Sequence, residues 1–182
     1  MRRDRLAGNG GTDEKAMRRK SFRVIGIAGA KESGKSTIAN LLVRENFYQL
    51  REMSQPIRWL FGDATGRKAD PQRIPRDRDA LNEMGKTLRY FLGEDVFIRM
   101  ALASVPFMED TGTPGIVIPG IRFKCEVDAI HEAGGEVWKV TRPGYTPDGS
   151  MYEPTDLDND KVIYNNGTEH ELGLVVRDML NG

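Results

Sequence analysis

The strongest chemical signature in the chain is a glycine-rich stretch, Gly29-Ala-Lys-Glu-Ser-Gly34-Lys35-Ser36, which fits the pattern G-x-x-x-x-G-K-[ST]. Glycines let the backbone turn so that successive N–H groups, together with the N-terminus of a following helix, face an anion. In such a loop Lys35 reaches the β- and γ-phosphates, the Ser36 hydroxyl ligates Mg²⁺ and Thr37 bonds the α-phosphate. The predicted ATP-binding residues are Gly29, Ala30, Lys31, Glu32, Ser33, Gly34, Lys35, Ser36 and Thr37.

This loop indicates binding of a nucleoside triphosphate, and several protein classes carry one. A GTPase would need an N/T-K-x-D motif after a later strand, and neither Thr141-Arg-Pro-Gly nor Asn165-Asn-Gly-Thr fits it. A motor ATPase is usually larger and has an apolar strand that ends in Asp or Asp-Glu. The apolar stretch 116–120 ends without an acid. The sequence therefore favours a small kinase whose second substrate lies across a cleft from the loop.

Apolar strands alternate with amphipathic helices along the chain after residue 21. Continuous or alternating apolar residues predict strands at 22–28, 48–53, 115–118, 136–141 and 161–164. Apolar residues at helical spacing predict helices at 36–45, 55–61, 81–92, 96–101, 123–130 and 168–180. Glycines and prolines predict a loop over 62–79 and another over 142–160. This alternation is typical of an α/β fold with a mainly parallel sheet.

The composition is that of one ordinary globular domain. The chain has 182 residues, and its 27 basic and 27 acidic side chains give zero net charge, which argues against a generally basic nucleic-acid binder. One cysteine, Cys125, excludes a disulfide framework, and two distant histidines argue against a Cys/His zinc site. Residues 1–20 carry seven basic and three acidic side chains without an apolar period, which predicts a disordered basic tail ahead of a single kinase domain at 21–182.

The order of several further segments resembles the deoxynucleoside monophosphate kinases of tailed bacteriophages, a P-loop family related to adenylate kinase. The resemblance spans residues 22–181 and depends on the segments 53–62, 81–89, 94–99, 119–123, 134–143 and 160–168, in that order. It implies a three-layer α/β/α fold with a five-stranded parallel sheet. It also implies an acceptor-binding region at 54–105 and a lid at 142–160.

One departure from this family concerns magnesium. The family usually has Asp-Val-Arg-Phe after its third strand, and here the segment is Gly120-Ile-Arg-Phe123. The aspartate that would hold Mg²⁺ through water is therefore missing. Magnesium must be positioned by Ser36, the phosphates, waters and another acid.

Arginines are the main candidates for catalysis and for acceptor binding, because their planar guanidinium is always charged and binds phosphate bidentately. Arg122 ends the central strand, where α/β sheets bind ligands, and the resemblance implies that it contacts the phosphates between the two substrates. Arg142 begins the lid and is expected to close on ATP. Lys35, Arg122 and Arg142 are thus the predicted catalytic residues.

The acceptor itself is expected to bind in the region of the middle helices. The predicted substrate-binding residues are Arg58, Trp59, Arg89, Arg99, Arg122 and Glu153. For Arg58, Arg89 and Arg99 the competing interpretation is a solvated helix face, and for Arg122 it is a salt bridge at a strand end. For Trp59 and its neighbour Phe61 it is packing in the core, which is the favoured interpretation of the two aromatics.

These observations predict an ATP- and Mg²⁺-dependent kinase that converts deoxynucleoside monophosphates to diphosphates for phage DNA synthesis in the host cytoplasm. Its expected partners are the small molecules ATP and the monophosphate. No stable nucleic-acid or membrane partner is expected, and the sequence does not decide between a monomer and a homodimer. One alternative is a P-loop kinase for another phosphorylated acceptor, such as dephospho-coenzyme A. The other is an ATP-dependent nucleic-acid accessory protein that uses the tail as its anchor.

Overall fold

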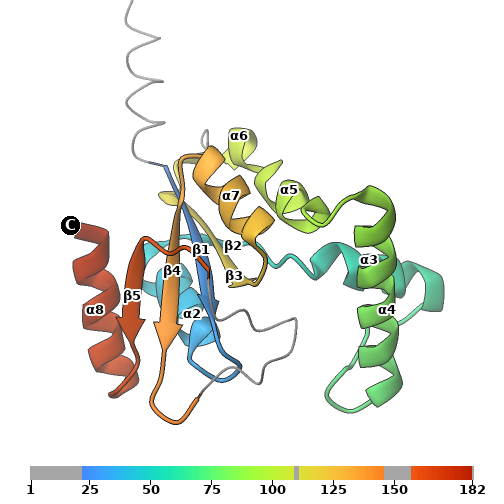
Figure 1. The fold of residues 1–182 in the computed structure, drawn as a ribbon, viewed down its shortest axis with the longest axis horizontal. Helices are drawn as coiled ribbons and strands as arrows, with labels where there is room; N and C mark the ends of the chain where they lie inside the picture. Colours follow the sequence, from blue (N-terminus) through green and yellow to red (C-terminus); the bar gives the residue numbers. More distant parts are fainter. Residues whose placement is uncertain (1–21, 109–110, 146–156, 182) are drawn as a thin grey trace, which may run out of the picture.

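A five-stranded, wholly parallel sheet forms the centre of the molecule (Figure 1). The computed structural model describes residues 22–108, 111–145 and 157–181. The strand order is β2-β3-β1-β4-β5. The strands are β1 (Arg23–Gly29), β2 (Gln49–Leu50), β3 (Gly115–Ile121), β4 (Glu136–Thr141) and β5 (Lys161–Tyr164). The predicted fold class is confirmed.

Helices cover both faces of this sheet. They are α2 (Lys35–Asn46), α3 (Gln55–Thr65), α4 (Pro75–Leu92), α5 (Val96–Leu102), α6 (Val105–Met108), α7 (Lys124–Glu132) and α8 (Glu169–Asn181). Successive side chains of β1 point to opposite faces of the sheet. Ile25 and Ile27 pack with α2 and α8 on one face, while Val24 and Ala28 pack with α5 and α7 on the other. Burial on both faces explains the nearly continuous apolar sequence of this strand.

The pair α3 and α4 extends away from the sheet, on the right in Figure 1. A small cluster of Ile57, Val96 and Phe97 joins this pair to α5, with Leu81, Met84 and Leu88 packed against it. Among the described residues, no helix has the length and apolarity to cross a membrane.

Two strands differ in length from their predictions. The strand predicted at 48–53 is only Gln49–Leu50 in the structure. The last backbone hydrogen bond to β3 runs from the Arg51 N–H to the Val117 oxygen at 2.9 Å, and the chain then turns toward α3. The strand predicted at 115–118 continues to Ile121. Pro119 is tolerated there because the pairing with β2 has already ended at Val117.

The prediction of one long loop over 62–79 is wrong. Gly62 lies inside α3, which continues to Thr65, and Pro75 is the first residue of α4, so the loop is only 66–74. Proline suits the first turn of a helix, where its missing N–H has no partner to lose, and a helix tolerates one internal glycine at a cost of about 1 kcal/mol. The short helix α6 had no sequence prediction. The predicted tail at 1–20 and most of the predicted lid, residues 146–156, lie outside the described residues.

Candidate active site

The glycine-rich loop joins β1 to α2 in a conformation that requires glycine at two positions. Gly29 has φ +145° and Gly34 has φ +108°. A Cβ atom at Gly29 would collide with the Val140 carbonyl oxygen, and one at Gly34 would collide with the Asn165 side-chain amide. Helix α2 begins directly afterwards at Lys35, so its free N–H groups face the loop. The arrangement is that of an anion-binding loop.

Lys35 and Ser33 show how side chains are arranged in this loop. The Lys35 ammonium donates to the carbonyl oxygens of Gly29, at 2.8 Å, and of Ala30. Ser33 is fully buried, and its hydroxyl has no hydrogen-bond partner among the described residues. A buried hydroxyl of this kind is costly unless something satisfies it. The loop therefore holds a cation at the edge of the cleft and an orphaned hydroxyl beneath its backbone, beside Gly29.

Residues from the far end of the sheet support the loop from outside. The Asn165 amide, just after β5, donates to the Ser33 carbonyl oxygen at 2.9 Å. Arg142, just after β4, donates to the Glu32 carbonyl oxygen at 3.4 Å, and its guanidinium lies 4.7 Å from the centre of the Tyr145 ring. Arg142 thus lies beside the loop, as a lid arginine would. Asn165 had no sequence prediction, because only the parallel topology brings β5 to this end of the sheet.

A cleft of about 490 Å³ lies between the loop and the helices α3 and α4. It is lined by Lys35, Ser36, Glu52, Met53, Ser54, Ile57, Arg58, Pro71, Arg78, Leu81, Asn82, Gly85, Lys86, Arg89, Phe97, Pro119, Gly120, Arg122 and Phe123. Five residues predicted from the sequence therefore lie around one cavity: Lys35, Ser36, Arg58, Arg89 and Arg122.

Other predicted site residues do not reach this cleft. Trp59 is 65% exposed, which contradicts the favoured core packing, whereas Phe61 is buried as expected. Two residues correspond to about 200° around a helix, so Trp59 points away from the face that Ile57 and Phe61 bury. Arg99 points outward from α5 and pairs with Asp95 at 3.1 Å. Glu153 lies outside the described residues.

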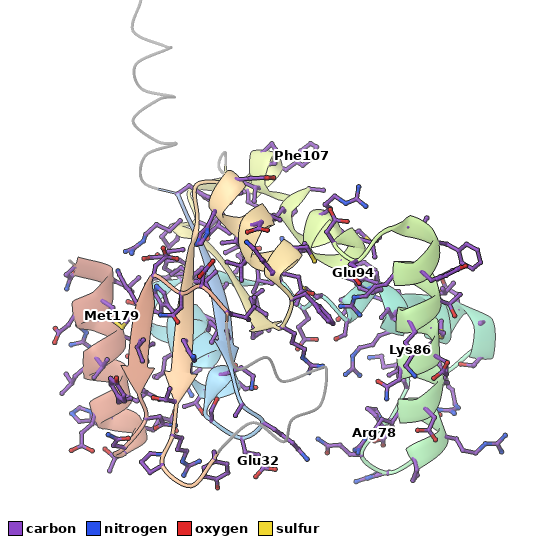
Figure 2. The ribbon with its side chains drawn as sticks, viewed as in Figure 1. Glu32, Arg78, Lys86, Glu94, Phe107 and Met179 are labelled. Atoms are coloured by element: carbon purple, nitrogen blue, oxygen red, sulfur yellow. The ribbon has the colours of Figure 1, made fainter. Side chains whose placement is uncertain are left out.

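The cleft also contains polar residues that had no sequence prediction. Three of them, Arg78, Asn82 and Lys86, and the predicted Arg89 are spaced by four, four and three residues along α4, so all four share one face of this helix. Figure 2 shows Arg78 and Lys86 on α4, across from Glu32 of the glycine-rich loop. The signal was present in the sequence as a polar stripe with the same spacing as the apolar one. It was hidden because Arg78 falls within the segment expected to be a loop.

Two lining arginines are connected through a buried carboxylate. The Arg89 guanidinium lies between the rings of Phe97 and Phe123, 4.7 and 5.0 Å from their centres. It pairs with Glu126 of α7 at 3.3 Å, and Glu126 also accepts the backbone N–H of Arg122 at 2.8 Å. Burial raises the pKa of the Glu126 carboxyl, although these backbone N–H groups and Arg89 oppose the shift.

The donor atoms along the cleft fit Mg²⁺ bound together with phosphates. Ser36 offers a hydroxyl, and Glu52, directly after β2, is the one acid among the described residues that line the cleft. Both are hard oxygen donors, and Mg²⁺ usually takes only one or two protein ligands beside substrate phosphates. No group of three His, Cys, Asp or Glu in the described part of the chain could hold a metal ion alone. Any magnesium here would therefore depend on the nucleotide.

Gly120, where the resemblance leads one to expect aspartate, is the extra residue of a bulge in β3. Ile27 pairs with Pro119 and Ala28 with Ile121, so Gly120 has no partner in β1. Its φ is +88°, a conformation that L-residues rarely adopt, and a Cβ there would meet nothing within 4 Å. The backbone thus favours glycine, and the cleft keeps open space beside it.

Comparisons with known proteins agree with this geometry. No protein-family model matches the chain. A protein of Acanthamoeba polyphaga mimivirus, provisionally named a deoxynucleotide monophosphate kinase, is 26% identical over 176 residues, which is 82% of this chain and 91% of that protein. The APS kinase of Mycobacterium tuberculosis, solved with AMPPNP and APS, superposes with a TM-score of 0.53 at 13% identity, over 89% of this chain and 99% of that one.

A second structural neighbour is a provisionally named kinase of Chloroflexus aurantiacus, with a TM-score of 0.50 and 10% identity over 88% of this chain and 97% of the other. At such identities these neighbours show the fold alone. The chain has the α/β fold of P-loop kinases with a nucleotide-binding loop, and the mimivirus relative and the neighbours together support a phosphotransferase. The relative is a protein of a mimivirus and not of a bacteriophage.

Proposed function

We propose that this protein transfers the γ-phosphoryl group of ATP to a deoxynucleoside monophosphate and releases the diphosphate and ADP. The observation that carries the proposal is the charge of the cleft beside the glycine-rich loop. Among the described residues that line it, the cations are Lys35, Arg58, Arg78, Lys86, Arg89 and Arg122, against the single acid Glu52. Such an excess suits two substrates that both carry phosphate, and it suits an uncharged acceptor poorly.

Each group has a role that follows from its place. Phosphoryl transfer needs little covalent chemistry from a protein, but it needs alignment and positive charge around the migrating group. Lys35 would bind the β- and γ-phosphates, Ser36 and Glu52 would hold Mg²⁺, and Arg122 would meet the transferring group from the end of β3. Bound Mg²⁺ would neutralise charge on the β- and γ-oxygens.

The acceptor would bind against α3 and α4. Arg58 and Arg89 would bind its phosphate from two different helices, and Arg78 and Lys86 extend the same cationic face. Arg142 would close on ATP from the segment after β4. In this proposal residues 54–105 form the acceptor-binding region and 142–160 the lid of one kinase domain. The enzyme would act in the cytoplasm of a host cell in which phage or other viral DNA is synthesised.

The test is a coupled assay of ADP production with each of the four deoxynucleoside monophosphates, their ribose forms and dephospho-coenzyme A. ATP consumption should require a monophosphate and should yield the diphosphate on chromatography. The deoxy form should be preferred by up to about 10²-fold, because a close-packed pocket rejects an added hydroxyl only modestly. ATP loss that DNA stimulates, without any diphosphate, would support the nucleic-acid accessory protein instead.

A further inference from the structure

Glu126 is the most deeply buried acid at the edge of the cleft. Its side chain is 1% exposed, at the first turn of α7. One oxygen accepts the backbone N–H groups of Arg122, at 2.8 Å, and Phe123, at 3.2 Å. The other oxygen accepts from the Arg89 guanidinium at 3.3 Å. One carboxylate therefore connects the end of β3, the start of α7 and the last turn of α4.

Arg89 is held on three sides by this arrangement. The rings of Phe97 and Phe123 lie against its guanidinium, and Glu126 contacts one of its terminal nitrogens. Its Nε atom is buried without a hydrogen-bond partner among the described residues. A planar guanidinium that stacks on aromatic rings and pairs with a carboxylate at one end has a fixed orientation. Its remaining N–H groups therefore point in a fixed direction. An arginine constrained in this way is ready to bind a phosphate without first losing side-chain entropy.

We propose that Glu126 is a positioning residue that sets Arg89 and Arg122 in register for the acceptor phosphate. The inference rests on the proposed function of the cleft. Helix α4 packs mainly on α3 and α5, so it is joined to the sheet at a distance. The link through Glu126 fixes the Arg89 side chain of this outlying helix relative to Arg122 at the end of β3.

The two contacts of Glu126 can be separated by substitution. Glutamine serves as well as glutamate for accepting backbone N–H groups at a helix start, so Glu126→Gln keeps the contacts to Arg122 and Phe123. It removes the charge that pairs with Arg89. Glu126→Ala removes both contacts. Glu132→Gln, an exposed change on the same helix, is the matched control.

Steady-state kinetics distinguish positioning from general stability. Loss of a charged hydrogen bond should raise the KM for the monophosphate about tenfold in Glu126→Gln, with the KM for ATP within about twofold of wild type. Glu126→Ala should also lower kcat, because Arg122 loses its anchor. In an Arg89→Ala background Glu126→Gln should add little to the monophosphate KM. Double-mutant comparisons resolve differences of about twofold. A KM for the monophosphate in Glu126→Gln that stays within about twofold of wild type would therefore overturn the inference.

A second measurement needs no substrate. The Nε–H resonance of Arg89, assigned by its loss in Arg89→Lys, should be protected from exchange in the wild type and in Glu132→Gln, and should broaden or exchange rapidly in Glu126→Gln. An unchanged resonance contradicts the positioning role whatever the reaction proves to be. If the resonance changes but the wild type phosphorylates no monophosphate, the proposed function fails and only the structural link between Glu126 and Arg89 stands.

Discussion

Arg122 and Lys35 face the same cleft from different elements, and their expected contributions differ. Lys35 belongs to the loop that binds the triphosphate, so it interacts with ATP before and during the reaction. Arg122 leaves the end of β3 beside the cleft. There it would meet charge that develops only when both substrates are bound, and such contacts stabilise the transition state more than either ground state.

We therefore expect Arg122→Lys to lower kcat far more than it weakens ATP binding. Arginines that meet a transferring phosphoryl group contribute about 10³ to 10⁵ in turnover, and lysine keeps the charge but loses the planar fork. Lys35→Ala should impair ATP binding and turnover together. Kinetics and ATP-binding calorimetry on the two variants make the comparison. Turnover of Arg122→Lys within about threefold of wild type, well short of that contribution, would reduce Arg122 to an ordinary strand-end charge.

Helix α3 has one buried face and one exposed face, and its two large aromatic residues divide between them. Phe61 is 6% exposed and Trp59 is 65% exposed. Phe61→Ala should lower the free energy of unfolding by about 3 kcal/mol, since it opens a cavity, whereas Trp59→Ser should change it by less than about 0.5 kcal/mol. Urea denaturation measures both. Equal losses in the two variants would mean that Trp59 is covered in solution.

The loop between α3 and α4 is held by a charged contact with a buried aspartate. The carboxylate of Asp77, at the start of α4, accepts hydrogen bonds from both terminal nitrogens of Arg67, at 2.6 and 2.7 Å. It also accepts one from the Asp70 N–H at 2.8 Å. The hydrogen bonds from Arg67 are the largest cause that lowers the pKa of the Asp77 carboxyl from 3.8 to about 2. A lowered pKa means that this contact stabilises the fold above pH 3.8 and stops doing so as the pH falls through about 2.

The pH dependence of this contact can be measured with Asp77→Asn. The difference in urea midpoint between wild type and variant should stay constant from neutral pH to about pH 5 and shrink below it. The Asp77 carboxyl of the unfolded chain then begins to protonate, whereas that of the folded chain stays ionised down to about pH 2. Lys86→Gln, which removes an exposed pair with Glu83, is a control whose midpoint should remain close to wild type throughout. A difference that grows as the pH falls would contradict the assignment.

At the scale of the whole molecule, the sequence predicted what local pattern controls. The loop at 29–36 is a continuous motif, and the buried strands around it read as apolar runs, so the α/β class and the triphosphate site could both be predicted. Arg89 and Arg122 were also predicted to lie near the acceptor. The contact from Arg89 to Glu126 was not, because it joins residues 37 positions apart through packing that no local pattern encodes.

Errors of prediction arose where a residue has two common uses. The sequence predicts Pro75 in a loop, but Pro75 is the first residue of α4. The polar face that Arg78 and Lys86 share on this helix was therefore not predicted. For Trp59 core packing was favoured over stacking on the acceptor base, but its position relative to Ile57 and Phe61 sets its direction. In both cases the geometry of the helix, rather than the residue type, decides the outcome.

The strand order also bears on how the chain is synthesised. Strand β1 lies at the centre of the sheet and is made first, yet its partners come much later, since Arg23 pairs with Gly115 and Ile25 with Glu136. At roughly 5 to 20 residues per second, a ribosome needs on the order of ten seconds to reach β4 after β1. Until β3 is made at residues 115–121, β1 has neither of the strands that flank it in the sheet. We therefore expect helix α2, the first element made that packs against Ile25 and Ile27, to cover these side chains in the nascent chain until the centre of the sheet can close.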